Sequence, residues 1–182
     1  MKKHTMSLAT RRKVLIVHLI SSSTWIGAVI VLLLLSILAK MSTHPQELLT
    51  LHQAIRIIEY GLIIPPAFTS LITGFFLSGW TKWGYFQYWW VTVKWIVTIG
   101  LILFGAFFLN TWIEGMVELA KDLELEALFH NTYTQYSWLN IIFVSLQWSL
   151  LIFLVVISVL KPWGRRQKKM TRLDVKTKST RE

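Results

Sequence analysis

Two ionisable side chains, His18 and Lys94, stand inside long apolar stretches of the sequence. A neutral imidazole can ligate haem iron or a divalent metal ion, or pass protons, and a lysine amine can pair with a carboxylate. Ionisable groups inside a membrane-spanning helix are costly, so we treat both residues as candidate functional groups. Two structural alternatives stay open. His18 could make a polar contact with another helix through neighbouring serines, and Lys94 could extend its stem to the lipid headgroups.

Four apolar segments must position these two residues, and each is long enough to cross a membrane. The chain of 182 residues is 54% hydrophobic and only 15% charged, which is unlike a soluble domain. A helix rises about 1.5 Å per residue and the hydrocarbon core is about 30 Å thick, so the expected spans are residues 14–39, 57–78, 85–109 and 138–160. We predict an all-α fold, an integral membrane up-down four-helix bundle, as one domain over residues 14–163.

The net charge of +10 lies mainly in two basic tails, residues 1–13 and 164–182. The connectors at residues 41–60 and 110–137 carry few Lys or Arg, so the positive-inside rule predicts that both termini are cytoplasmic. This distribution argues for membrane topology and against nucleic acid as a partner. The expected partners are the lipid bilayer and, at the tails, anionic headgroups. The second tail is poor in apolar residues and is expected to be disordered, and a homo-oligomer stays open.

The connectors and the second span carry helical patterns of their own. Pro45 is suited to the first turn of a helix, so the second helix should begin before its membrane span. Apolar residues alternate with acids in "TWIEGMVELAKDLELEALF", which predicts an amphipathic helix on the outer membrane surface. Pro65 and Pro66 interrupt the second span and should kink it.

Depth in the membrane tests whether the two ionisable residues belong together. With both tails inside, His18 in the first span lies about 6 Å from the cytoplasmic surface. Lys94 in the third span lies about 9 Å from the same surface. The second span ends near Ser78, which puts Thr73 and Gly74 in the same layer. Residues from three helices are thus expected to meet at one level in the inner half of the membrane.

The first helix adds further groups near this layer. Ser21 and Ser22 follow His18 by about one turn and Trp25 follows it by about two turns, on the same face. Gly27 is expected to allow the close approach of another helix or of a flat ligand.

Three further histidines, His44, His52 and His130, lie on the outer side in this topology. They could form a copper or zinc site if folding brings them together, and otherwise they are exposed polar residues. The chain has no cysteine, which excludes disulfides and thiolate metal sites.

Four motifs, in order, resemble those of a loose group of bacterial membrane proteins with four to eight helices. The first helix carries H-x6-W-x-G at His18, Trp25 and Gly27. The second ends in a T-G-hydrophobic pattern, "FTSLITGFFLSGW", the third carries W-x3-K at Trp90 and Lys94, and the fourth exits with "VISVLKPWGRR". The group includes the copper-resistance protein D domain, the HemJ-type protoporphyrinogen oxidases and uncharacterised four-helix families, which this chain resembles most closely.

The resemblance implies a protein of the bacterial cell membrane that binds haem b. In the HemJ-type proteins the first-helix histidine is the haem ligand and the third-helix lysine is needed for activity, and these roles fall on His18 and Lys94. We expect Lys94 to contact a propionate, and Trp25, Gly27 and Trp90 to complete the cofactor site. The alternatives are a HemJ-like oxidase of a porphyrinogen and a copper-handling membrane protein. The chain lacks the Arg, the Tyr-His pair and the Arg-x-x-Asn-Glu segment of the HemJ-type proteins, which speaks against the oxidase.

Overall fold

The computed structural model describes residues 6–80 and 84–164, and these residues form helices without any β-strand. The α-helices are α1 (Leu8–Lys40), α2 (Pro45–Ile58), α3 (Ile64–Gly79), α4 (Trp89–Phe104), α5 (Asn110–Asp122) and α6 (Asn131–Leu160). The described chain also has two π-helical segments and a 3-10 helix, which are η1 (Glu59–Ile63), η2 (Gly105–Leu109) and η3 (Glu124–Phe129). The predicted disorder of the second tail lies outside the described residues.

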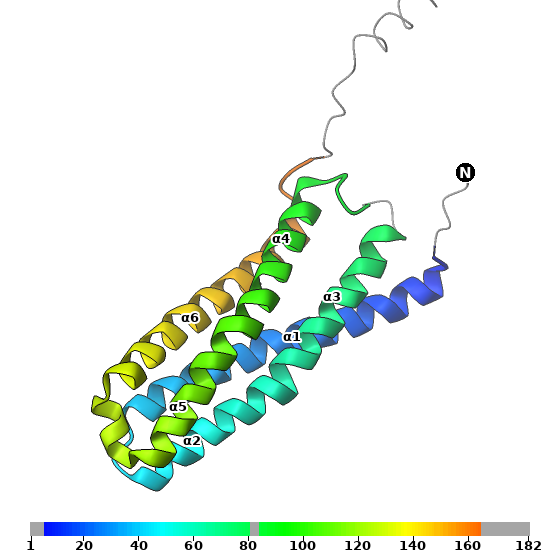
Figure 1. Ribbon diagram of the computed structural model, residues 1–182. Coiled ribbons are helices and arrows are strands. Elements are labelled where there is room, and N and C mark those ends of the chain that lie inside the picture. The colour runs from blue at the N-terminus through cyan, green and yellow to red at the C-terminus, as the bar shows by residue number, and fades with distance from the viewer. Residues whose placement is uncertain (1–5, 81–83, 165–182) are drawn as a thin grey trace, which may run out of the picture.

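The helices join into four long rods, each long and apolar enough to cross a membrane. The rods are Leu8–Lys40, Pro45–Gly79, Trp89–Asp122 and Asn131–Leu160. Consecutive rods run in opposite directions, so the start of α1, the end of α3, the start of α4 and the end of α6 lie together at what we call the terminal end (Figure 1). The predicted all-α four-helix bundle is confirmed, and the chain has the build of a multi-pass membrane protein.

Local sequence accounts for several helix ends. Ser7 precedes α1, and its Oγ accepts a hydrogen bond from the amide of Thr10 at 3.1 Å. Pro45 is the first residue of α2, as predicted, because the N–H that proline lacks is not needed there. Lys161 ends α6 in the left-handed conformation, with φ of 48°, and Pro162 follows it.

The π-helical segments keep the second and third rods continuous. η1 ends shortly before Pro65 and Pro66, which have no N–H for the regular helix hydrogen bonds. The hydroxyl of Thr69 donates to the carbonyl of Pro65 at 2.8 Å. The second rod thus departs from a regular α-helix just before the proline pair, as a widened turn, and the predicted kink stays a prediction.

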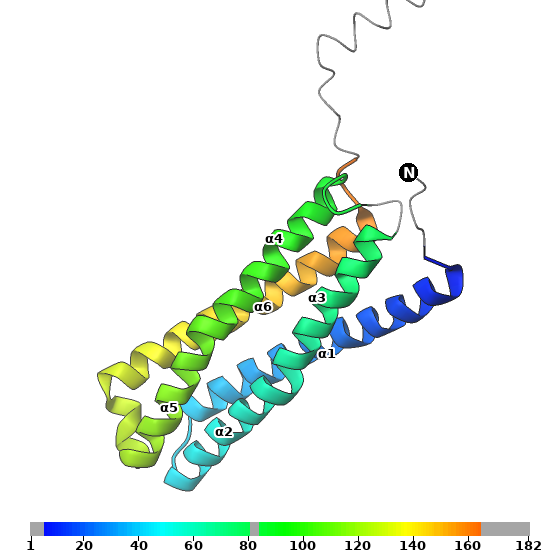
Figure 2. The same ribbon diagram turned by 45° about the vertical axis from the view of Figure 1, so that its right-hand side comes forward.

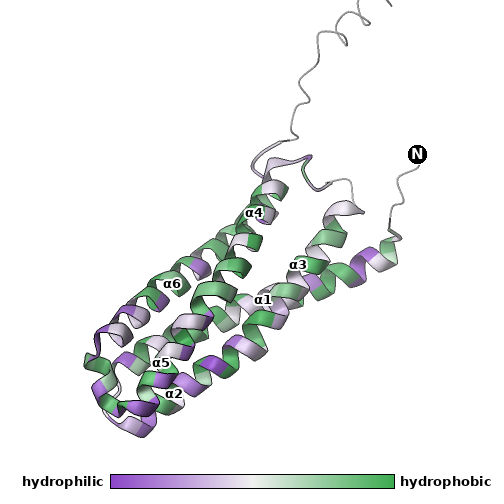
Figure 3. Ribbon diagram, viewed as in Figure 1, coloured by the Kyte–Doolittle hydropathy of each residue, from purple (hydrophilic) through white to green (hydrophobic). Residues whose placement is uncertain are grey.

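Residues 110–122 do not form a separate helix on the membrane surface, which corrects the prediction. α5 continues α4 through η2 and packs against α2 and α6. Its apolar stripe is buried in the bundle and consists of Ile113, Met116, Val117 and Ala120. An amphipathic pattern fits a protein partner as well as a lipid surface, and here the partner is the bundle itself. Figure 3 shows hydrophilic residues gathered at this end, which we call the α2–α5 end.

The core is dense toward the α2–α5 end and looser toward the terminal end. Fully buried side chains toward the α2–α5 end include Val29, Leu48, Ile113 and Val144, from four different helices. By contrast, none of the described α1 residues before Ser21 is buried. In both ribbon views α1 separates from α4 and α6 toward its start (Figure 2). The first third of α1 is therefore only loosely packed against the bundle.

Candidate functional site

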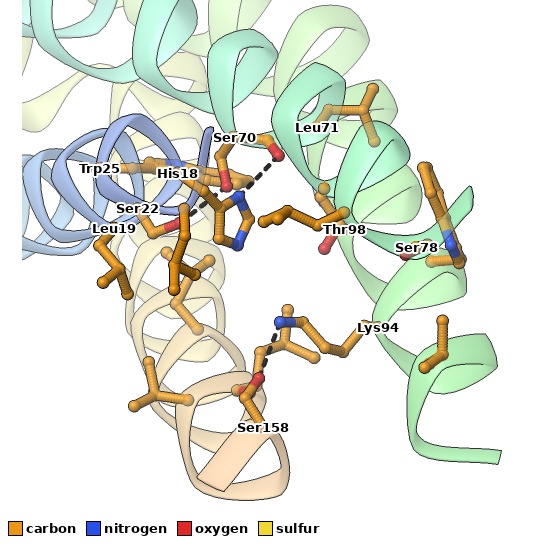
Figure 4. A pocket seen from close by; sticks show the side chains of 18 of the residues that line it. His18, Leu19, Ser22, Trp25, Ser70, Leu71, Ser78, Lys94, Thr98 and Ser158 are labelled. Atoms are coloured by element: carbon orange, nitrogen blue, oxygen red, sulfur yellow. Dashed lines mark hydrogen bonds between the residues drawn. The ribbon is translucent and has the colours of Figure 1, made fainter. Parts of the chain in front are cut away.

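A cavity of about 480 Å³ lies between α1, α3, α4 and α6 toward the terminal end. Its lining is largely apolar and includes the rings of Trp25, Trp90 and Trp95. Polar groups from all four helices also line it, chiefly Arg11, His18, Ser22, Ser70, Lys94 and Ser158. His18 and Lys94 face the same space from opposite sides (Figure 4). The structure thus brings together the two residues that the depth argument grouped.

His18 is held by α3 through one ring nitrogen. Its Nδ1 lies 3.1 Å from the carbonyl oxygen of Ser70 and 3.0 Å from Oγ1 of Thr73. A carbonyl only accepts, and the Thr73 hydroxyl donates its own proton to the carbonyl of Thr69 at 2.7 Å. Both contacts are satisfied with the proton on Nδ1, and in the neutral imidazole this leaves Nε2 with an available lone pair. The ring points into the cavity (Figure 4).

The two serines that follow His18 behave differently from each other. Oγ of Ser22 lies 2.8 Å from Oγ of Ser70, so this pair forms a second polar link between α1 and α3 at the cavity wall. Ser21 is buried and donates to the carbonyl of Val17 in its own helix at 2.7 Å. His18 does make a polar interhelical contact, but with residues of α3 and not through the α1 serines. That contact uses only one of its two ring nitrogens.

Lys94 turns into the cavity. Its Nζ donates to Oγ of Ser158 on α6 at 2.7 Å, and the side chain is partly buried. The amine thus lies at the cavity wall beside α6, and the alternative of a stem that extends to the headgroups stays open. Ser158 was not predicted because a serine in an apolar span carries no charge to mark it. Its place one turn before the Lys161–Pro162 exit of α6 is the signal that could have found it.

Arg11 also lines the cavity, although its side chain is exposed. On sequence alone it belongs to the basic tail, since it precedes the apolar span, and this role was missed. Of the described residues that line the cavity, Arg11 and Lys94 are the basic residues besides His18, and none is acidic. The lining therefore favours an occupant with an apolar body and an anionic group.

Two of the predicted tryptophans lie at the cavity, and the predicted glycine does not. Trp25 and Trp90 line the cavity, with 2% and 8% of their surfaces exposed. Gly27 does not, which corrects the prediction: it is exposed, and a Cβ there would meet nothing within 4 Å. It follows Trp25 by two residues, about 200° around the helix, and so points away. Gly74 on α3 lies beside the imidazole instead, and a Cβ there would make an ordinary contact of 3.5 Å with Cε1 of His18.

The three outer histidines do not meet. His52 has only 1% of its surface exposed, and its Nε2 lies 2.8 Å from the hydroxyl oxygen of Tyr133. It stands one turn after Leu48 on the buried face of α2, so it is not the exposed polar residue of the alternative. Within the described residues, no three His, Asp or Glu side chains are grouped to hold a metal ion. The copper or zinc site from His44, His52 and His130 is therefore not formed.

Comparisons of the chain with protein-family models, with curated proteins and with solved structures found no match. The resemblance to the copper-resistance protein D and HemJ group therefore stays a prediction from the four motifs.

Proposed function

We propose that the protein is a haem b-binding membrane protein in which Nε2 of His18 ligates the haem iron. The hydrogen bond from Nδ1 of His18 to the carbonyl of Ser70 is the observation that carries this proposal. Metal-ligating histidines typically donate their other ring N–H to a carbonyl or a carboxylate, which orients the ring and raises the basicity of the ligating nitrogen. His18 has this arrangement, and its unprotonated nitrogen is available to a ligand in the cavity.

The cavity suits an occupant of the size and polarity of haem. Its volume of about 480 Å³ falls within the roughly 300–1,000 Å³ of small-molecule and cofactor sites. The indole rings of Trp25, Trp90 and Trp95 offer flat apolar surfaces to a porphyrin. Lys94 lies across the cavity from His18, where its amine can pair with a propionate (Figure 4).

Two further residues serve the anionic end of this ligand. Ser158 accepts from Nζ of Lys94 and so keeps the amine in the cavity, and Arg11 adds a second cation for the second propionate. The count of Lys and Arg in the tails assigns the terminal end to the cytoplasmic face of the cell membrane. Haem would then lie in the inner half of the membrane. Bound haem supplies one-electron chemistry, and the part of the protein is to ligate it, orient it and exclude water.

The absorption spectrum of the purified protein tests this proposal. Protein that is expressed with an ample haem supply and purified in mild detergent should show a Soret band, with about one haem per chain, and the band should shift when the iron is reduced. A colourless protein that takes up no haem from solution either would overturn the proposal.

A further inference from the structure

A second, smaller cavity of about 70 Å³ lies next to the first, and Trp25 lines both. Its walls include residues of both π-helical segments, η1 and η2. Among the described residues that line it, the polar ones are Trp25, Glu59 from η1 and Gln147 from α6. π-Helical turns are frequent at functional sites. Here a π-helical turn places a carboxyl group at the wall of a cavity.

The three polar side chains are almost fully buried. Glu59 has 4% of its surface exposed, and Trp25 and Gln147 have 2% each. Neither Oε2 of Glu59 nor Nε1 of Trp25 has a hydrogen-bond partner among the described residues. Buried polar atoms without partners are costly, and in folded proteins ordered water commonly satisfies them.

The smaller cavity has the room and the polar groups that internal water needs. A water molecule requires roughly 10–15 Å³ of such volume and two to four polar partners, so about 70 Å³ accommodates more than one. The carboxyl of Glu59, the indole N–H of Trp25 and the amide of Gln147 provide acceptors and donors. Water between these groups would satisfy the atoms that otherwise have no partner.

On its other side, Glu59 approaches charged residues near the α2–α5 end. Arg56, which precedes Glu59 by about one turn, and Tyr60, which follows it in η1, both lie at Glu114 on α5. Glu114 pairs with Arg56, whose Nε lies 2.8 Å from Oε1. The hydroxyl of Tyr60 donates to Oδ1 of Asn110 at 2.7 Å and lies 3.4 Å from Oε1 of Glu114. The side chains of Arg56 and Glu114 are 45% and 36% exposed, so this group reaches the surface. None of the described residues from α1, α3, α4 and α6 that line the cavity is charged.

We propose that Glu59 is a buried proton-exchange site, whose carboxyl group gives its proton to water in the smaller cavity and regains one from the surface at Glu114. A carboxylate without a cation beside it is costly in the interior of a membrane protein, so the neutral acid is the resting form. Among the described residues the salt bridge of Arg56 is made to Glu114, and none joins it to Glu59. The ligand of this site is the proton, and the site does not depend on bound haem.

The two cavities follow one another along the bundle. The residues of α1 that line them run from Arg11 to Leu32, which is about 31 Å at the helical rise and matches the thickness of the hydrocarbon core. Trp25 stands where the two cavities adjoin. Glu59 thus lines a cavity that adjoins, at Trp25, the cavity of His18.

Infrared spectroscopy of the purified protein tests this site, because a protonated carboxyl has a C=O stretching band distinct from that of a carboxylate. Wild-type protein should show such a band, Glu59→Gln should lose it, and transfer to D2O should shift it. Gln147→Leu removes one polar partner of the cavity water and should slow this shift by about two- to tenfold. Glu47→Gln changes an exposed acid of α2 and is the matched control, which should keep the band.

Three results would overturn the proposal. If no protonated band depends on Glu59, the residue is ionised; if the band does not respond to D2O, the site is sealed from water. If the D2O shift in Gln147→Leu proceeds at the wild-type rate, water held by Gln147 takes no part in the proton exchange. The spectra are recorded on haem-free protein as well, so failure of haem binding leaves this test intact. Circular dichroism of each variant shows whether the helices are kept.

Discussion

Nδ1 of His18 on α1 lies 3.1 Å from the carbonyl oxygen of Ser70 on α3. A carbonyl oxygen has two lone pairs, so Ser70 can accept this bond and still serve its own helix. The bond ties α3 to the part of α1 that has no buried residue, and it fixes the ring proton on Nδ1. One contact therefore both positions the imidazole and, in the neutral ring, leaves the lone pair of Nε2 available.

Removing the second partner of Nδ1 should weaken haem binding without abolishing it. Thr73→Val deletes the hydroxyl at 3.0 Å and keeps the carbonyl of Ser70, so we expect about a tenfold loss of haem affinity, measured by titration. The matched control is Thr24→Val, because Thr24 bonds only to its own helix and does not line the cavity. Equal affinity in the two variants would show that the Thr73 contact does not orient a ligand.

Loss of the Lys94 amine should speed haem release and spare the Soret band. Lys94→Met removes the charged partner of a propionate but leaves the iron ligand, so haem transfer to an acceptor protein should be about 10- to 100-fold faster. Lys121→Met neutralises an exposed lysine of α5 and should release haem at the wild-type rate. If Lys94→Met releases haem at the wild-type rate, the Lys94 amine bonds to Ser158 and does not hold a propionate.

The space beside His18 should tolerate one methyl group and no more. A Cβ at Gly74 would lie 3.5 Å from Cε1 of His18, an ordinary contact, so Gly74→Ala should keep haem binding. Gly74→Leu must displace the imidazole and should lose the Soret band. Gly27→Leu should bind haem normally, since Gly27 faces open space. Loss of haem in Gly27→Leu would contradict the placement of the cavity.

The orientation of the bundle can be tested by labelling, because the chain has no cysteine. A single cysteine in place of Glu126, an exposed residue of η3, should react with a membrane-impermeant maleimide in intact cells. A cysteine in place of Leu8, which is 73% exposed, should react only after permeabilisation. A reporter fused after Glu182 should likewise report the cytoplasm. Reversed labelling would mean that the Lys and Arg count assigned the wrong sides.

Much of the bundle follows from the sequence, because span length and helical rise are local properties. The same arithmetic placed His18 and Lys94 at similar depth, and the structure has both at one cavity. The continuity of the third rod could not be read in this way. The acids after Asn110 suggest a helix leaving the bundle, whereas the buried stripe of α5 finds its partners in α2 and α6.

Contacts between distant residues account for the remaining errors. His52 is buried because Tyr133, 81 residues away, meets its ring, and no local pattern marks that pair. Glu59 is one acid in a connector until the fold places it at an internal cavity. Gly27 matched a motif, but the rotation of α1 against its neighbours decides which residues face inward, and it turns Gly27 outward.

Haem titration of purified apoprotein, with wild type beside His18→Ala, tests the central claim most directly. The Soret absorbance of the wild type should saturate near one haem per chain. His18→Ala should bind haem more than about 100-fold more weakly, because the iron loses its ligand, and it should still insert, because the change removes a polar group from an apolar span. His44→Ala, an exposed residue at the α2–α5 end, should titrate like the wild type. Identical titrations of His18→Ala and wild type would contradict the account.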